Sequence, residues 1–253
     1  RHVMATARTL TEIPALPRVG TWRDSPFASS LRRLRRSKVV LACAGYLMVM
    51  VIVALAAPLV APDDPLAMAP RERFQGPNWS HPCGTDEFGR DICSRLIYGA
   101  RISLEVGVIS VGISLLIGAG LGLIAGYYGR LVDAVISRVM DVFFAFPAIL
   151  LAIALMAMLG SNIRNVMIAI GVVNVPIFMR VARASTLTVR ASQYVEAATS
   201  AGAGDARVLA RHVLPNIAAP LIVQATLAFA WAIINEAALS FLGLGTQPPT
   251  PSW

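Results

Sequence analysis

Charged residues are scarce in this sequence. Asp, Glu, Lys and Arg make up 14% of its 253 residues, whereas the hydrophobic types make up 56%. A soluble domain carries about a quarter charged residues, so the apolar surplus exceeds what one water-soluble core needs. The apolar residues fall in long runs, as is typical of segments that cross a lipid bilayer. The composition therefore predicts an all-α, polytopic membrane protein without room for an added soluble domain of ordinary size.

Residues that perform chemistry are also few. The chain has three His and three Cys residues, no set of nucleophile, base and orienting group, and no Gly-x-x-x-x-Gly-Lys-Ser/Thr nucleotide loop. Cys-x-x-Cys pairs, a hallmark of structural zinc sites, are absent as well. The sequence therefore predicts no catalytic, cofactor-binding or metal site. The net charge of +8 is concentrated beside apolar runs, without interleaved exposed aromatics, so nucleic-acid binding is not expected.

Five apolar segments are candidates for membrane spans. The first would cover roughly 34 Å as a helix at 1.5 Å per residue, enough for the hydrocarbon layer. The fourth span has the shortest uninterrupted apolar run. Its helix must therefore continue through Arg180 and Arg183, whose long stems can carry their charges to the interface. The predicted spans are 38–61, 102–128, 139–160, 164–187 and 215–244.

The basic residues orient these spans. Of the 22 Lys and Arg residues, 16 fall in segments 1–38, 129–138 and 180–212, so the positive-inside rule places the N-terminal tail (1–37) in the cytoplasm. The tail lacks a secretory signal, so the first span should remain as a helix. Residues 62–101 then form an outer loop with a short helix, ahead of a helical core (102–253). Because the sequence stops at Trp253 in what resembles a loop, we expect a sixth span to follow.

The most informative segment is 193–213, which lies between the fourth and fifth spans. It is predicted to form two short helices, because the Gly202-Ala203-Gly204 run breaks a helix at low cost and Asp205 can cap the second helix. Each helix has a small apolar face. Such a pair can dock into a groove of another protein or lie on the lipid surface, and the residues alone leave both interpretations open.

The same segment resembles the coupling loop of ABC-importer permeases. The family's pattern is Glu-Ala-Ala, then a glycine after three intervening residues, then an apolar residue followed by Pro, and all three parts occur here at the family's spacing. One departure is Gly204, which stands where many relatives have a polar residue. In that family the loop seats in a cleft of the ATP-hydrolysing subunit. The resemblance implies that the coupling residues are Glu196, Ala197, Ala198, Gly202, Asp205, Arg207, Leu214 and Pro215.

Two further segments, 81–105 and 239–253, resemble the peptide and nickel branch of these permeases, on the side of its second channel subunit. The likeness covers about residues 38 to 253. It implies a type I ABC importer permease fold in the bacterial inner membrane and a heterodimer with a homologous permease. It also implies two partner ATPase subunits that carry ATP and Mg²⁺, and an extracytoplasmic binding protein that delivers peptide. Nickel or another small solute remains an alternative cargo, and a self-contained channel or secondary transporter is the alternative of a different class.

Some polar and small residues inside the predicted spans need an explanation. Asn174, Asn235 and Glu236 could line a translocation path, make helix–helix hydrogen bonds or lie at the outer mouth. Glycines recur every fourth residue in the second span, at positions 118, 122 and 126, which favours close helix packing. Cys83 and Cys93 share the outer loop, where either a disulfide or two free thiols can occur.

Overall fold

A computed structural model describes residues 37–246 and 249–251. All but one residue of the predicted N-terminal tail therefore lie outside the described residues. The chain divides into two units, Arg1–Val49 and Met50–Trp253. The described part is helical and contains no strand, only one isolated bridge between Thr85 and Asp91.

The first predicted span is helical. Helix α2 (Lys38–Leu55) is followed by a short helix, α3 (Ala57–Val60). Only Ala54 is buried in α2, and the other side chains are at least partly exposed, as suits a helix that meets lipid. Beyond it, the outer loop contains one 3₁₀ turn, η1 (Pro70–Glu72).

The second unit is built around two long helices that pack closely, α4 (Ile92–Tyr128) and α7 (Ile163–Arg190). The short helix predicted in the outer loop and the span predicted at 102–128 are one continuous helix, because no Pro separates them and the single glycine between them, Gly99, is buried within the helix. Gly118, Gly122 and Gly126 face α7: a Cβ atom at Gly122 would lie 2.3 Å from the Met179 carbonyl oxygen. The small residues therefore allow the two backbones to approach.

The segment predicted as a third span, 139–160, differs most from expectation. The structure has two helices here, α5 (Arg130–Phe144) and α6 (Ala148–Leu159), bent by 90°. Pro147 explains the break, since proline disfavours helical conformation in the residue before it and has no N–H to donate. Helix α5 also includes the residues predicted as a cytoplasmic loop, 129–138.

The last part of the chain forms α8 (Gln193–Ser200), α9 (Asp205–Val208), a π-helical turn η2 (Leu209–Val213) and α10 (Leu214–Phe241). The second short helix was predicted to be separate from the fifth span. Instead, the helical backbone runs without interruption from Asp205 to Phe241. Pro215 lies in the first turn of α10, where its missing N–H costs little. The predicted sixth span would follow Trp253 and stays a prediction.

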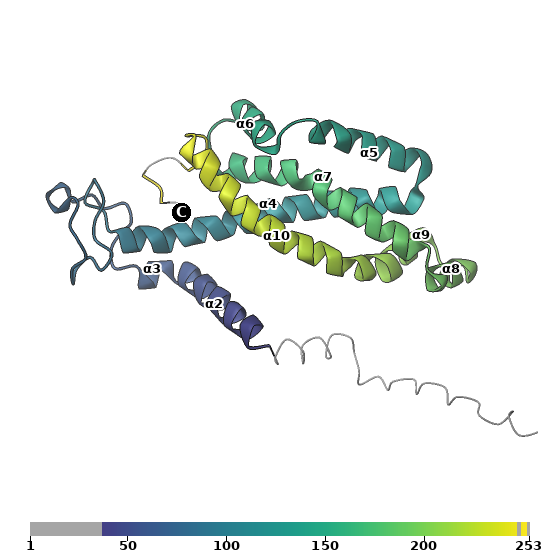
Figure 1. Cartoon of the computed structure of the whole chain (residues 1–253), viewed down its shortest axis with the longest axis horizontal. Helices are drawn as coiled ribbons and strands as arrows, with labels where there is room; N and C mark the ends of the chain where they lie inside the picture. Colours follow the sequence, from purple (N-terminus) through teal and green to yellow (C-terminus); the bar gives the residue numbers. More distant parts are fainter. Residues whose placement is uncertain (1–36, 247–248, 252–253) are drawn as a thin grey trace, which may run out of the picture. The chain divides into compact units, whose positions relative to one another are not determined.

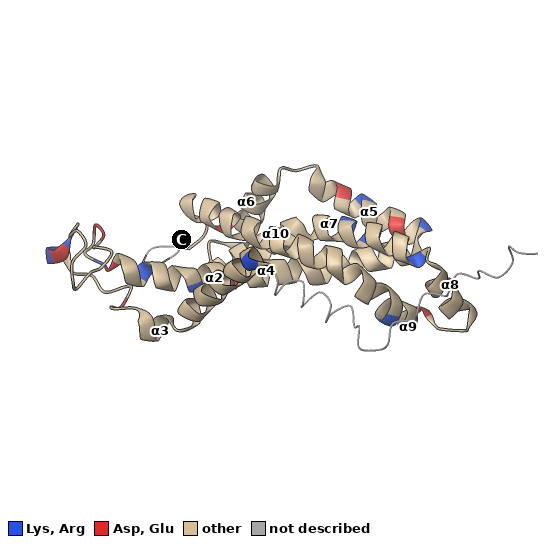
Figure 2. Cartoon of the chain, turned by 60° about the horizontal axis from the view of Figure 1, so that its bottom comes forward, with Lys and Arg blue, Asp and Glu red and all other residues tan. Residues whose placement is uncertain are grey.

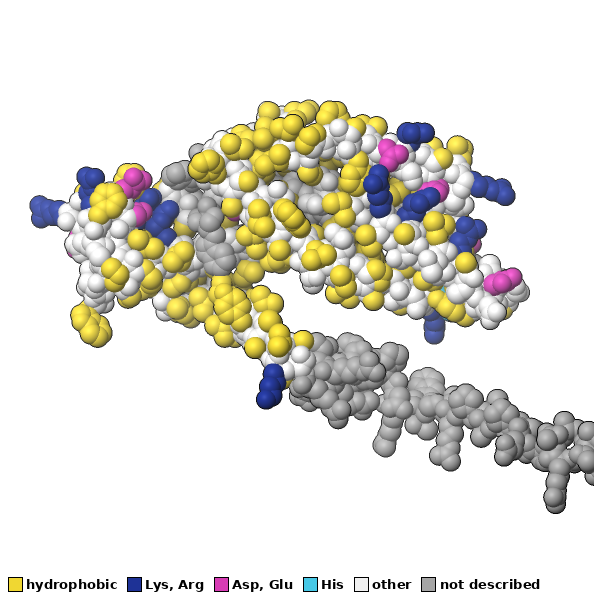
Figure 3. Space-filling model, viewed as in Figure 1, with side chains coloured by type: hydrophobic (Ala, Val, Ile, Leu, Met, Phe, Trp, Pro, Cys, Tyr) yellow, Lys and Arg dark blue, Asp and Glu magenta, His cyan; other side chains and the backbone are white. Residues whose placement is uncertain are grey.

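Charged side chains of the second unit gather at its two ends. Figure 1 shows α8 and α9 at one end and the loop that precedes α4 at the other. Figure 2 shows Lys, Arg, Asp and Glu near these ends and near α5, with an almost uncharged stretch between them. Hydrophobic side chains cover that stretch in the space-filling view (Figure 3). Four helices, or five spans if the bent pair counts as one, are long and apolar enough to cross a membrane among the described residues.

Candidate functional site

The predicted coupling loop, residues 193–213, folds as two short helices joined by a tight turn. At the end of α8 the Gly202 amide donates to the Thr199 carbonyl (2.9 Å) and the Ala203 amide to the Ala198 carbonyl (3.1 Å). This pair of bonds closes a helix around a residue in the left-handed conformation, and Gly202 has φ of 86°. A Cβ atom at Gly202 would meet nothing within 4 Å, so the turn requires glycine for its backbone conformation and not for space.

The inner face of the coupling loop is anchored in the helix bundle. Val195, Val208 and Val213 are buried in one apolar cluster with Tyr127 of α4 and Phe178 of α7. Burying one such valine contributes about 1.5 to 3 kcal/mol. Since close-packed interiors transmit displacement rather than absorb it, a shift of the loop must also move the ends of α4 and α7.

A hydrogen bond adds a directional contact to this anchor. The sequence predicted that Asp205 caps α9, but Gly204 occupies the cap position and no side-chain cap bond forms. Instead, the Tyr127 hydroxyl donates to Asp205 Oδ1 at 2.9 Å, which ties the start of α9 to the end of α4. The two residues are 78 positions apart, so sequence analysis gave no signal for this pair.

The other face of the loop is exposed to solvent. A pocket of about 460 Å³ lies beside it, lined partly by Arg190, Glu196 and Thr199. Ala198 is half-buried, and the other predicted coupling residues are exposed: Glu196, Ala197, Gly202, Asp205, Arg207, Leu214 and Pro215. The predicted coupling residues are therefore accessible, on a segment whose three valines are buried against the helix bundle.

Two ion pairs join α5 to α7 near the coupling loop. Arg183 makes a two-pronged contact with the Asp133 carboxylate, and Arg180 Nη2 lies 3.0 Å from Asp141 Oδ1. The Arg180 guanidinium also lies 3.7 Å from the centre of the Phe144 ring. The sequence predicted that both arginines extend toward the interface. These pairs were missed because the bent course of α5 and α6, which brings the acids alongside α7, was not foreseen.

The predicted path residues occupy two different environments. Asn174 and Asn235 line one small cavity among α6, α7 and α10. Glu236 is fully buried, and its Oε1 accepts hydrogen bonds from the hydroxyls of Ser240 and Thr246, each at 2.7 Å. Its Oε2 has no hydrogen-bond partner within the described residues. Glu236 thus holds the turn after α10 onto the helix, while the role of all three in a path stays a prediction.

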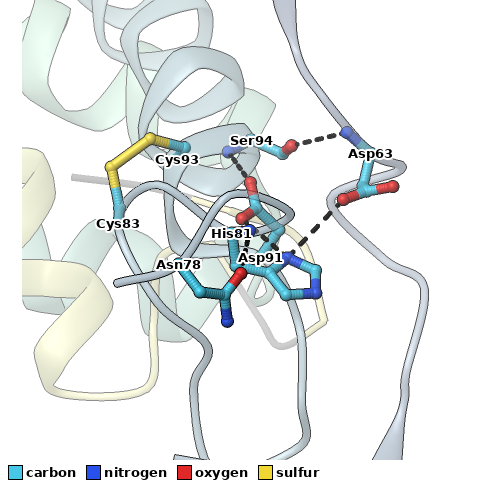
Figure 4. The surroundings of a disulfide bond; sticks show 7 residues. All are labelled: Asp63, Asn78, His81, Cys83, Asp91, Cys93 and Ser94. Carbon is cyan, nitrogen blue, oxygen red and sulfur yellow. Dashed lines mark hydrogen bonds and ion pairs between the residues drawn. A yellow bond between two sulfur atoms is a disulfide. The ribbon is translucent and has the colours of Figure 1, made fainter. Parts of the chain in front are cut away.

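The outer loop is cross-linked to the start of α4. Cys83 and Cys93 form a disulfide, shown in Figure 4. The Asp91 carboxylate caps α4 by accepting the Ser94 amide at 2.6 Å. The His81 imidazole lies against this cap, with Nδ1 3.1 Å from Asp91 Oδ1. The loop is therefore held at three adjacent points.

Two groups of this loop have shifted pKa values. Burial by itself would lower the pKa of His81, but hydrogen bonds with Asp91 and Glu72 and the nearby carboxylate charges outweigh it, so the pKa is raised. Burial likewise acts to raise the pKa of Asp86. Backbone amides of Arg90 and Phe88 and the Arg90 guanidinium donate to its carboxylate, and the net result is a lowered pKa.

Comparison with known sequences gives two family matches. Residues 118–253 match the family described as binding-protein-dependent transport system inner membrane component, and residues 25–77 match the N-terminal TM domain of oligopeptide transport permease C.

Individual relatives match over most of the chain. The dipeptide transport system permease protein DppC of Alkalihalophilus pseudofirmus is 46% identical over 90% of this chain and 75% of the relative. The di/tripeptide transport system permease protein DppC of Pseudomonas aeruginosa is 45% identical, over 90% and 78%. The glutathione transport system permease protein GsiD of Pectobacterium atrosepticum is 41% identical, over 90% and 76%.

The fold also resembles a solved transporter. A structure of the MetNI methionine ABC transporter in an inward-facing conformation aligns with a TM-score of 0.52 at 19% identity, over 59% of this chain and 75% of that one. The predicted type I importer permease fold is thereby confirmed. The family match over more than half of the chain and the identities with relatives over most of it show that the chain belongs to the inner membrane components of binding-protein-dependent ABC transport systems.

Proposed function

We propose that this chain is one of two channel-forming subunits of an ATP-driven importer of di- or oligopeptides. The named relatives serve transport of dipeptides, di- and tripeptides and glutathione, which is itself a tripeptide. In this proposal the chain pairs with a homologous permease. An extracytoplasmic protein delivers the peptide, and two separate subunits bind ATP and Mg²⁺.

One observation carries the mechanism, namely the two-sided construction of the coupling loop. Its exposed polar face can enter a groove of an ATPase subunit, while its buried valines and the Tyr127–Asp205 hydrogen bond engage the spans. Since α9 continues through η2 into α10, movement of the docked loop becomes movement of α10 without a flexible joint. ATP binding would then bias the spans between two packing arrangements.

The proposed orientation places the coupling loop and the N-terminus in the cytoplasm of a bacterial cell. The distribution of basic residues supports it, because positive charge accumulates on the cytoplasmic side. In the structure, Arg130, Arg138, Arg190 and Arg207 all belong to the end of the second unit that carries the coupling loop or to helix α5 beside it.

The test is reconstitution of the transporter with this chain altered at one exposed acid. Glu196→Lys reverses a charge on the docking face without touching the buried valines, so ATPase subunits should no longer co-purify and ATP-dependent uptake of a labelled di- or tripeptide should be lost. The matched control is Glu87→Lys, the same change on the outer loop, which should leave ATPase binding intact.

Other results of this experiment would contradict the coupling role, change the cargo or change the class of transporter. Normal assembly and transport by Glu196→Lys would contradict the coupling assignment. ATP-dependent uptake of Ni²⁺ without uptake of peptide would replace the cargo while retaining the coupling mechanism. Solute movement by the purified chain without ATPase subunits would identify a self-contained channel or secondary transporter.

A further inference from the structure

Three side chains of the outer loop converge around one small space. They are Asp63, which follows α3, His81 and Asp91, the cap of α4 (Figure 4). His81 Nδ1 lies 3.1 Å from Asp91 Oδ1 and 3.6 Å from Asp63 Oδ2. One donor atom from each residue falls within 4.8 Å of the other two. An imidazole between two carboxylates is a mixed nitrogen and oxygen donor set, which differs from a patch of acids on a surface.

These separations suit a bound metal ion. With bonds of about 2.0 to 2.2 Å to nitrogen and oxygen, two ligands at a tetrahedral angle lie about 3.4 Å apart. The two distances from His81 Nδ1 fall on either side of that value. The donor atoms of Asp63 and Asp91 lie within 4.8 Å of each other and would have to come to about 3.4 Å. The Asp63 side chain is 50% exposed, so a rotation can bring it in, whereas the Asp91 side chain is 1% exposed and fixed.

The surrounding residues position each donor. Asp91 uses Oδ2 for the Ser94 amide and leaves Oδ1 toward His81. The Ser94 hydroxyl accepts the Asp63 amide at 3.0 Å, so one residue orients both acids. His81 Nε2 lies 3.3 Å from Glu72 Oε2, on the side away from the converging donors. A carboxylate on the far nitrogen is the usual outer partner of a metal-bound histidine.

We propose that Asp63, His81 and Asp91 form a binding site for a divalent first-row transition-metal ion, with Zn²⁺ as its representative. The imidazole nitrogen favours such ions over Ca²⁺ and Mg²⁺, which prefer six or more oxygen ligands. Solvent at the half-exposed Asp63 side would supply the fourth ligand. The bound ion would join three segments of the outer loop next to the Cys83–Cys93 disulfide and so stabilise the extracytoplasmic end of α4.

This proposal departs from the sequence analysis, which predicted no metal site because the loop has one histidine and no Cys-x-x-Cys pair. The three donors come from separate segments, so no motif spacing connects them. The proposal does not depend on the transported solute or on ATP coupling, and its failure would leave the proposed function unaffected.

The experiment compares variants of the full-length chain, free of affinity tags, in lipid nanodiscs. Zn²⁺ binding is measured by competition with a fluorescent chelator, and Co²⁺ replaces Zn²⁺ for a visible spectrum. The wild type should bind one ion more than Asp63→Asn, or bind it at least ten-fold more tightly. Its Co²⁺ bands should indicate nitrogen and oxygen ligands. Glu87→Gln, which removes an exposed acid from the same loop, should bind like the wild type.

Further arms keep the test decisive. His81→Gln should also abolish binding. If that variant does not fold, Asp63→Asn decides alone, because its backbone amide at position 63 can still donate to the Ser94 hydroxyl. Equal Zn²⁺ binding by the wild type and Asp63→Asn would mean an adventitious ion only and would overturn the proposal. The proposal is likewise overturned if Zn²⁺ does not bind, or if equimolar Ca²⁺ or Mg²⁺ displaces it; His81 then only bridges the acids by hydrogen bonds.

Discussion

The Tyr127–Asp205 contact offers the sharpest test of how the coupling loop is connected to the spans. Tyr127→Phe removes only the hydroxyl that donates to Asp205 and keeps the buried ring. A hydrogen bond to a charged acceptor contributes about 1.5 to 3 kcal/mol. Because Asp205 is exposed to solvent, we expect about 1 kcal/mol, which corresponds to an about five-fold change in an equilibrium constant.

The expected consequence is local. Helix α9 should detach from α4 about five-fold more often. The amides of Arg207 and Val208, which donate to the Gly204 carbonyl, should then exchange with deuterium faster by that factor. In the reconstituted transporter, ATP hydrolysis should continue while the amount of solute moved per ATP falls, since the docked loop moves without displacing α4.

Two controls separate this effect from general destabilisation. Tyr128→Phe removes a hydroxyl from the next residue, which has no hydrogen-bond partner for it among the described residues, and should change neither exchange nor transport. A double-mutant cycle with Asp205→Asn should show that the two changes are not additive. Unchanged exchange and unchanged transport per ATP in Tyr127→Phe would refute the reasoning that this bond transmits movement.

Three further predictions concern stability, each followed by thermal unfolding in nanodiscs. Gly122→Ala places a methyl group against the α7 backbone and should cost about 1 to 3 kcal/mol, whereas Gly120→Ala meets nothing within 4 Å and should be neutral or slightly stabilising. Asp133→Asn removes the charge that pairs with the partly buried Arg183, and we expect a loss of about 1 to 2 kcal/mol; an unchanged midpoint would mean that solvent screens the pair. The pKa of Asp86 is lowered on folding, so its contribution should be present above the ordinary aspartate pKa and lost as the pH falls through the folded value. Wild type and Asp86→Asn should therefore differ at neutral pH and converge in acid; a difference that persists in acid would contradict this.

Sequence patterning predicted the features that rest on composition and local spacing. The apolar runs predicted the helices, and Gly202 predicted the turn of the coupling loop. The four-residue glycine repeat predicted close packing on another helix, which the structure shows to be α7. These succeed because lipid burial, close backbone approach and positive φ each restrict the residue types at single positions.

The errors share a different cause. The residues directly on either side of Pro147 are apolar, so composition alone did not reveal the bend between α5 and α6. Asp205 is a residue type that commonly caps a helix, yet its carboxylate instead accepts a hydrogen bond from the Tyr127 hydroxyl, 78 positions away. Asp63 and Asp91 lie near His81 only because the fold brings together segments that are separate in the sequence. Contacts of this kind depend on the tertiary fold, which local spacing does not determine.

The structure also suggests which helices move as one body. Helices α4 and α7 are joined by the glycine face and by hydrogen bonds from the Ser110 and Ser114 hydroxyls to the Met167 and Gly171 carbonyls, at 2.9 and 2.7 Å. Sliding would break these bonds in a medium that offers no water to replace them. Helix α10 instead shares its backbone with the coupling segment. We therefore expect a force on the coupling loop to displace α4 and α7 together as one rigid pair and to tilt α10 relative to that pair.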